Sequence, residues 1–282
     1  MTTPTLTAER SPSPRQTVQP ATFGRLVAGE WIKFRSLRAN WWIVVLGTAF
    51  VPLFAVSRMI SIAQVPEAVG SPGMVAASYV TSGIALSQLA FAVLAVMAIT
   101  GEYGSGQIRT TLAAAPARLS AIAAKLVVIV GVVVSASVLA VAAAWACSAP
   151  WFSQLGMSIN LLNLEDARLL LGVPLYLAAV AALAFGIGLI VRSSAAGISI
   201  VVGLLLVIEN LLASIPWEPV QSFAAYLPSS AGSRLLQSEA VGSVITVSNS
   251  ALLSPWGGYG VMLLWVVAVL VAAAVLLRRK DA

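Results

Sequence analysis

Long apolar runs dominate the chain, and polar residues gather in the stretches between them. Six of these runs are long enough to cross about 30 Å of hydrocarbon as an α-helix. None of them alternates apolar and polar residues in steps of two, which argues against the strands of a membrane barrel. The pattern predicts an all-α integral membrane protein with six transmembrane helices, at about 41–60, 75–99, 119–147, 169–191, 196–214 and 257–277.

Six spans put both ends of the chain on one side of the membrane, and the basic residues indicate which side. Of the 16 lysines and arginines, only Arg58, Arg168 and Arg234 fall in segments of the opposite side. Cytoplasmic segments carry the excess of Lys and Arg, so we predict a multi-pass protein of the inner (cytoplasmic) cell membrane with both termini in the cytoplasm. Residues 1–22 are rich in Pro, Ser, Thr and Gln and predict a disordered cytosolic tail before a membrane domain at 23–282.

The composition narrows the possible functions. Hydrophobic residues make up 59% of the chain and charged residues 9%, with no histidine and one cysteine, Cys147. This excludes imidazole-based catalysis and an internal disulfide, and it leaves no residue set for a zinc site. We therefore expect no enzyme activity, no metal and no cofactor. The net charge of +6 comes from cations beside the spans, so we expect no nucleic-acid partner.

Residues 23–38 form an amphipathic pattern just before the first span. Apolar residues recur at helical spacing, whereas most of the cations lie away from them, which predicts a helix in the lipid headgroup layer. Glu30 falls inside the apolar arc and makes the pattern imperfect. A basic cytosolic linker remains the alternative. The residues expected to define the interfacial helix are Trp31, Lys33, Phe34, Arg35 and Arg38.

A second segment, residues 101–118, joins the second and third spans on the cytoplasmic side. Glu102 suits a helix N-terminus, Ile108 and Leu112 share one face, and Pro116 ends the pattern. A short helix at 102–115 would suit docking to a soluble partner. A solvated connector is the alternative, and the pattern alone does not choose between them.

Two short motifs carry a resemblance to a known family. The run from Glu102 to Leu112, EYGSGQIRTTL, resembles the E-Y-x-x-G-x-I-R-x-x-L pattern of permease subunits of ABC-2 type transporters, especially actinobacterial ones, and the run from Glu30 to Arg38 resembles their entry segment. Gln107 departs from the threonine of many relatives. The resemblance implies a transmembrane homodimer, or a pair with a homologous permease, driven by a separate ATP-binding cassette ATPase. It also implies a coupling helix that includes Glu102, Tyr103, Ile108, Arg109 and Leu112.

The chain has no phosphate-binding loop of its own. No G-x-x-x-x-G-K-[ST] run occurs, so ATP hydrolysis is expected from the partner subunit. The favoured interpretation is an exporter of an amphipathic drug, antibiotic or lipid. The alternatives are a secondary carrier driven by an ion gradient and a membrane anchor or sensor that transports nothing.

Glu209 and Asn210 form a possible polar site within the fifth span. A buried carboxylate in hydrocarbon costs about 2.5–3.5 kcal/mol on insertion scales, so such a residue usually has a purpose. A substrate contact or a proton-linked gate are the functional readings. Snorkelling to water, or capping a helix of the outer segment 215–256, are the structural ones. That outer segment holds several aromatic residues and prolines and predicts a partly ordered lid or an interfacial anchor.

Overall fold

The protein is an all-helical bundle. A computed structural model describes residues 22–65, 75–106, 118–238 and 253–280, and no strand occurs in these ranges. Six helical segments are long and apolar enough to cross a membrane, which confirms the predicted all-helical architecture and its six candidate spans. They are α2 (Arg38–Ala63), α4 (Ile84–Gly104), α6 (Arg118–Leu155), α7 (Leu164–Val191), the composite of α8 (Ser194–Val202), η2 (Gly203–Ile208) and α9 (Glu209–Ser214), and α12 (Pro255–Lys280).

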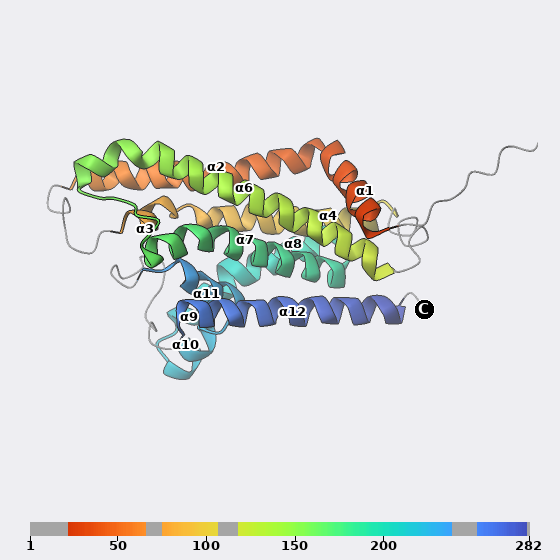
Figure 1. Cartoon of the computed structure of the whole chain (residues 1–282). Coiled ribbons are helices and arrows are strands. Elements are labelled where there is room, and N and C mark those ends of the chain that lie inside the picture. Colours follow the sequence, from red (N-terminus) through yellow and green to blue (C-terminus); the bar gives the residue numbers. More distant parts are fainter. Residues whose placement is uncertain (1–21, 66–74, 107–117, 239–252, 281–282) are drawn as a thin grey trace, which may run out of the picture.

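Shorter helices lie at the two ends of the bundle. Helix α1 (Phe23–Ser36) lies across one end of the bundle, the same end at which α12 finishes (Figure 1). We call this the basic end. The short elements at the opposite end are α3 (Ala76–Val80), α10 (Glu218–Ala224), α11 (Pro228–Ser233) and the 3-10 turn η3 (Arg234–Leu236).

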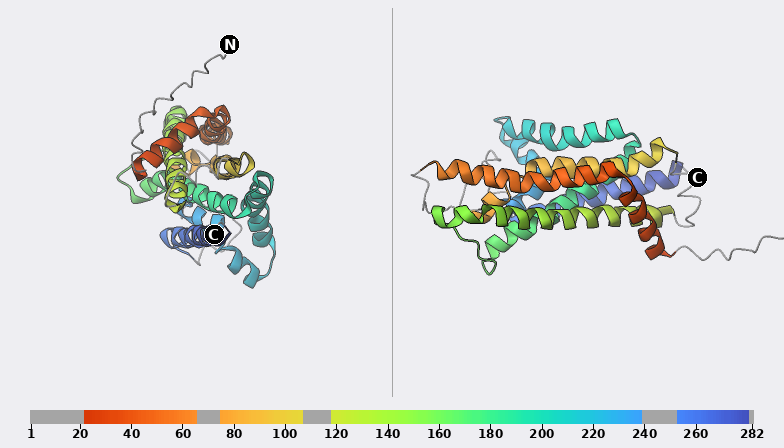
Figure 2. Two further views of the ribbon diagram at one scale, coloured as in Figure 1. Left: turned by 90° about the vertical axis from the view of Figure 1, so that its right-hand side faces the viewer. Right: turned by 90° about the horizontal axis from the view of Figure 1, so that it is seen from above.

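Helix α7 is the centre of the bundle. It packs against α4, α6 and α12 (Figure 2). In the most apolar stretch of α7, 83% of the residues are buried, compared with 22% in the corresponding stretches of α12 and of the fifth span. Small residues permit this close packing. A Cβ atom on Gly186 would lie 2.8 Å from Val269 of α12, and one on Gly188 would lie 2.9 Å from Ile99 of α4.

The second span differs from the continuous helix expected at 75–99. The chain forms α3, turns at Thr81–Gly83 and only then begins α4. The turn lies directly against the backbone of α2, where a Cβ atom on Gly83 would clash with the carbonyl group of Phe50. This contact explains the break, because only glycine permits such a close approach.

The fifth span also departs from a regular helix. It begins at Ser194, after a tight turn in which Arg192 adopts a left-handed conformation with φ of 61°. A π-helical stretch, η2, then interrupts it. Such wide turns rotate the residues that follow them, and here the first residue after η2 is Glu209.

Candidate functional site

Four charged side chains meet at the basic end, and we call them the four-charge cluster: Glu30, Lys33, Glu102 and Lys125. They come from α1, the last turn of α4 and the beginning of α6. Lys33 Nζ lies 2.7 Å from Glu30 Oε1 and 3.1 Å from Glu102 Oε1. Lys125 Nζ lies 2.5 Å from Glu30 Oε2 and 2.9 Å from Glu102 Oε1. The cluster therefore ties three helices together.

Three members of the four-charge cluster are almost fully buried. Glu30 and Glu102 are each 6% exposed and Lys125 is 8% exposed. Two cations and two anions cancel, which is the condition under which buried charges are tolerated. Glu102 Oε2 receives no hydrogen bond within the part of the chain that the structure describes, so Lys33 and Lys125 compensate this carboxylate through its other oxygen.

Lys33 is the most exposed member of the cluster. Burial alone would lower the pKa of its ammonium group, but the hydrogen bonds and charges of Glu30 and Glu102 outweigh burial and raise the pKa above its usual value. Lys33 therefore stays charged throughout the physiological pH range. Its contribution to stability is present below its unfolded pKa and is lost only as the pH rises through the raised folded value.

A cavity of about 420 Å³ lies beside the four-charge cluster. All four charged residues line it, together with apolar residues such as Met97 and Ile129. A space lined by both charged and apolar side chains suits an amphipathic molecule or a lipid chain.

The residues predicted to define an interfacial helix separate into two groups. Phe34 is buried and Trp31 stacks on it, with ring centroids 6.0 Å apart. Lys33 joins the four-charge cluster, whereas Arg35 is exposed. The expected single helix over 23–38 is wrong at its end, because α1 stops at Ser36 and Arg38 begins α2.

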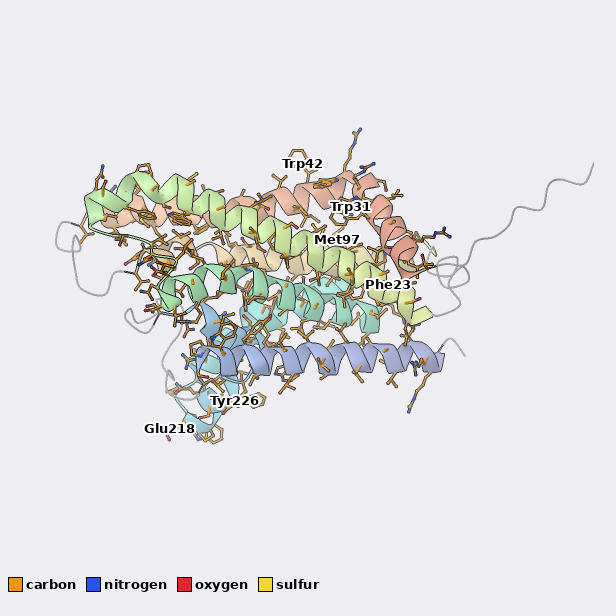
Figure 3. The ribbon with its side chains drawn as sticks, viewed as in Figure 1. Phe23, Trp31, Trp42, Met97, Glu218 and Tyr226 are labelled. Atoms are coloured by element: carbon orange, nitrogen blue, oxygen red, sulfur yellow. The ribbon has the colours of Figure 1, made fainter. Side chains whose placement is uncertain are left out.

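Aromatic residues mark the junction of α1 and α2. Trp42 projects away from the bundle and is 74% exposed (Figure 3). The ring of Trp41 packs edge-on against Phe34, and its indole N–H donates to the carbonyl of Arg35. Exposed tryptophans beside a span are typical of the membrane boundary.

Part of the expected coupling helix lies elsewhere in the fold. Glu102 and Tyr103 belong to the last turn of α4, so the prediction that Glu102 begins a separate helix is wrong. The apolar pattern does not reveal that α4 continues past its membrane-length core. Arg192 lies over the ring of Tyr103 at 5.2 Å and joins α4 to the turn before α8. The remaining predicted residues, Ile108, Arg109 and Leu112, lie outside the described residues.

Glu209 and Asn210 do not form a joint polar site. Glu209 is 3% exposed, and its carboxylate accepts hydrogen bonds from the backbone N–H groups of Ser229 at 2.9 Å and Ser230 at 2.5 Å. It therefore caps α11 of the outer segment, which is one of the structural readings given above. Asn210 is exposed and donates to the carbonyl of Leu206.

The other end of the same outer segment is held by an arginine that the sequence did not single out. Arg168 of α7 donates to the carbonyl oxygens of Leu235 at 2.8 Å and Gln237 at 3.0 Å. Glu209 and Arg168 thus bind opposite ends of the stretch 228–238. Their charges match the helix dipole, with the anion at the N-terminus and the cation at the C-terminus.

Sequence reasoning also missed the role of Lys125. This lysine lies inside the predicted span 119–147, where a cation needs an anionic partner, so this signal was present. No group of metal-ligating side chains occurs in the described ranges.

No family model matches the chain, and no curated protein matches it.

Proposed function

We propose that this chain is the membrane-spanning subunit of an ABC-2 type exporter that moves an amphipathic compound outward. One observation carries the proposal. The two motifs that resemble this family are far apart in the sequence, yet their charged residues meet: Lys33 contacts both Glu30 of its own motif and Glu102 of the other. Two motifs that pack together are better explained by a shared role than by two independent coincidences.

The four-charge cluster would transmit a movement of α4 to α1 and α6. Helix α4 ends within the predicted coupling segment 102–115, which is the proposed contact with the ATPase. A push there would move the last turn of α4, and ion pairs would carry the motion to α1 and α6. Thr100 and Ser194, whose hydroxyl oxygens are 2.7 Å apart, connect α4 to α8. Coupling of this kind requires a contiguous set of contacts, which the bundle has at this end.

The proposed orientation places the basic end in the cytoplasm of a cell-membrane protein. Among the described residues, the basic end holds the larger set of cations: Arg25, Lys33, Arg35, Arg38, Lys125, Arg192, Arg278 and Arg279. The opposite end holds Arg58, Arg168 and Arg234. The positive-inside rule then assigns the larger set to the cytoplasm. The partners would be an ATP-binding cassette ATPase, a second copy or a homologous permease, and the lipid bilayer.

Glu209 supports the exporter over the ion-driven carrier. A carrier of that kind generally needs an intramembrane acid that is free to exchange its ion. Both oxygens of Glu209 accept hydrogen bonds from α11, which suits a structural cap. A membrane anchor or sensor that transports nothing would have no ATPase partner. The co-purification experiment below therefore distinguishes this alternative from the proposal.

The test asks whether a neighbouring reading frame encodes an ATP-binding cassette ATPase and whether that ATPase co-purifies with this chain. The wild-type chain is expected to retain the ATPase through detergent extraction and affinity purification. Ile108→Glu and Arg109→Glu are each expected to reduce the retained ATPase about tenfold, because a buried charge or a reversed one disrupts a docked helix. Arg278→Glu, exposed in α12, is the control and is expected to retain it. Absence of the ATPase from the wild-type complex, or full retention by both variants, would contradict the proposal.

A further inference from the structure

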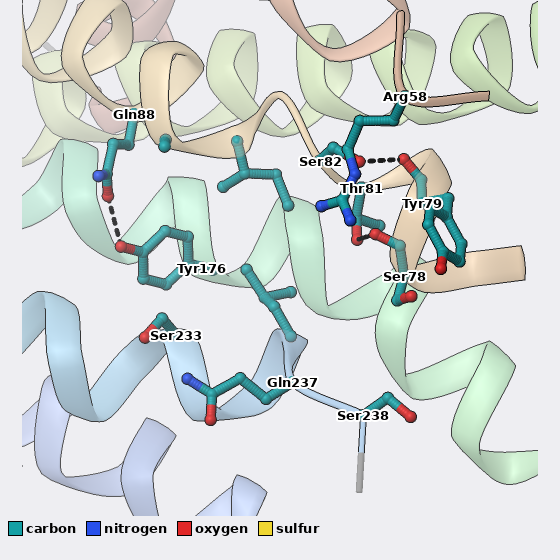
Figure 4. Close-up of a pocket in the computed structure, with 13 residues that line it drawn as sticks. Arg58, Ser78, Tyr79, Thr81, Ser82, Gln88, Tyr176, Ser233, Gln237 and Ser238 are labelled. Carbon is teal, nitrogen blue, oxygen red and sulfur yellow. Dashed lines mark hydrogen bonds between the residues drawn. The ribbon is translucent and has the colours of Figure 1, made fainter. Parts of the chain in front are cut away.

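A small polar cavity lies at the end of the bundle opposite the four-charge cluster. We call it the outer chamber; its volume is about 120 Å³, and α2, α3, α4, α7 and the stretch 233–238 enclose it (Figure 4). Arg58 reaches into it from α2, and Gln88, Tyr176 and Gln237 lie on its other sides. The remaining lining residues are Ser78, Tyr79, Thr81, Ser82, Ile84, Ala85, Ser233, Leu236 and Ser238.

Six of the seven described hydroxyl groups that line the outer chamber have their protons engaged in hydrogen bonds; the exception is that of Tyr79. Ser78 donates to the carbonyl of Val75, Thr81 to that of Ser78, and Ser233 to that of Ser230. A hydroxyl has one proton to donate. These side chains therefore do not supply the donors that a ligand in the chamber would meet.

Three other groups supply donors. The oxygen of the Gln88 amide accepts from Tyr176, and that of Gln237 accepts from Arg234 at 2.9 Å, so the amide NH₂ groups of both glutamines remain as donors. The guanidinium of Arg58 lies 5.0 Å from the centre of the Tyr79 ring, which holds it in place. Within the described ranges, none of the ion pairs includes Arg58.

Arg58, which is in none of the ion pairs of the described ranges, and the amide groups of Gln88 and Gln237 together favour an anionic ligand. We propose that the outer chamber binds a compact oxyanion, a carboxylate or phosphate group, at the head of the exported amphipath. A guanidinium matches the paired oxygens of such a group with two parallel hydrogen bonds. The apolar rim of Ile84, Ala85 and Leu236 suits the first carbons of the attached chain.

The size of the outer chamber fits this assignment. One water needs about 10–15 Å³ of such space, so a chamber of about 120 Å³ holds about ten waters, which is room for a carboxylate or phosphate group and the first carbons of its chain. The segment that closes the chamber is the one held by Glu209 and Arg168. Release of the ligand is therefore coupled to the position of α11 and η3.

The claim that the oxyanion belongs to cargo rests on the proposed export function, whereas binding itself does not. Equilibrium binding separates the two. The full chain in nanodiscs of zwitterionic phosphatidylcholine is titrated by calorimetry with dodecyl phosphate, inorganic phosphate or dodecyltrimethylammonium. If dodecyl phosphate binds but is not transported in an ATP-dependent way, the outer chamber is an oxyanion site, but its ligand is not exported cargo. Absence of binding would reject the chamber whatever the protein transports.

The wild type is expected to bind dodecyl phosphate and not the ammonium amphiphile. Arg58→Gln is expected to weaken binding about tenfold or more, with Arg58→Lys between the two, because lysine keeps the charge but loses the paired geometry. Gln237→Glu introduces a carboxylate that repels the oxyanion without removing Arg58. This variant replaces Arg58→Gln as the test if Arg58→Gln fails to fold. Arg278→Gln makes the same charge change outside the chamber and is expected to bind normally.

Two results would overturn the proposal in whole or in part. Equal binding of the ammonium amphiphile, or dodecyl phosphate binding unchanged in both Arg58→Gln and Gln237→Glu, rejects the oxyanion site. Inorganic phosphate bound as tightly as dodecyl phosphate, with the same dependence on Arg58, keeps the oxyanion site but rejects an amphipathic ligand.

Discussion

Lys125→Met is expected to cause the largest loss of stability of any single change at the basic end. The variant leaves Glu30 and Glu102, both 6% exposed, with Lys33 as their shared partner. Removing one member of a buried ion cluster costs about 3–5 kcal/mol, because an uncompensated charge stays buried. That is a large part of the 5–15 kcal/mol that typically holds a folded domain together. The measurements are the yield of monodisperse protein and the thermal unfolding midpoint in detergent.

A second substitution tests whether charge imbalance is the cause. Adding Glu102→Gln to Lys125→Met leaves the neutral pair Glu30 and Lys33, and this double variant is expected to recover much of the lost stability. Arg278→Met, a change of the same charge at an exposed position, is expected to unfold like the wild type. An unfolding midpoint of Lys125→Met equal to that of the wild type would show that the cluster does not stabilise the bundle.

Glu209→Ala is expected to release the outer segment from the bundle. The backbone N–H groups of Ser229 and Ser230 lose their acceptor, and a buried donor left unpaired costs about 1–3 kcal/mol. Helix α11 depends on close packing, since a Cβ atom on Gly232 would clash with Met262 and lie 3.0 Å from Tyr176. Loss of the cap should therefore disturb the outer chamber as well. Faster proteolysis of the outer segment and a lower unfolding midpoint are the expected results.

The neighbouring residue provides a matched control. Asn210→Ala removes an exposed side chain that bonds to its own helix, and a change of this kind typically stays within about 0.5 kcal/mol. Glu209→Gln keeps one acceptor oxygen and is expected to fall between the alanine variant and the wild type. Proteolysis of Glu209→Ala at the wild-type rate would mean that the carboxylate is not the cap.

Much of the fold follows from the sequence, because membrane spans depend on length and polarity alone. The six apolar runs and the separation of Arg58, Arg168 and Arg234 from the cations of the basic end are of this kind. The break before α4 was not predictable. Residues 75–99 carry no charge and are mostly apolar, and the turn at Gly83 depends on its contact with Phe50, which is distant in the sequence.

The candidate sites were harder to predict because each depends on a partner from another helix. Glu30 looked like a flaw in an amphipathic pattern, and its burial is explained by Lys33 on the same helix together with Lys125, almost a hundred residues later. Helical periodicity cannot identify that pairing. Glu209 was singled out correctly as a buried acid, but its cap on α11 depends on how residues 228–230 fold back to it.

The orientation of the basic end is the claim on which both the motor contact and the outer chamber depend. The direct test places a single cysteine at exposed Ser105, in a chain whose native thiol is removed by Cys147→Ala, and labels it with a membrane-impermeant maleimide. Intact cells are expected to leave Ser105→Cys unlabelled, and inside-out vesicles are expected to label it fully. Labelling in intact cells and protection in the vesicles would contradict the account.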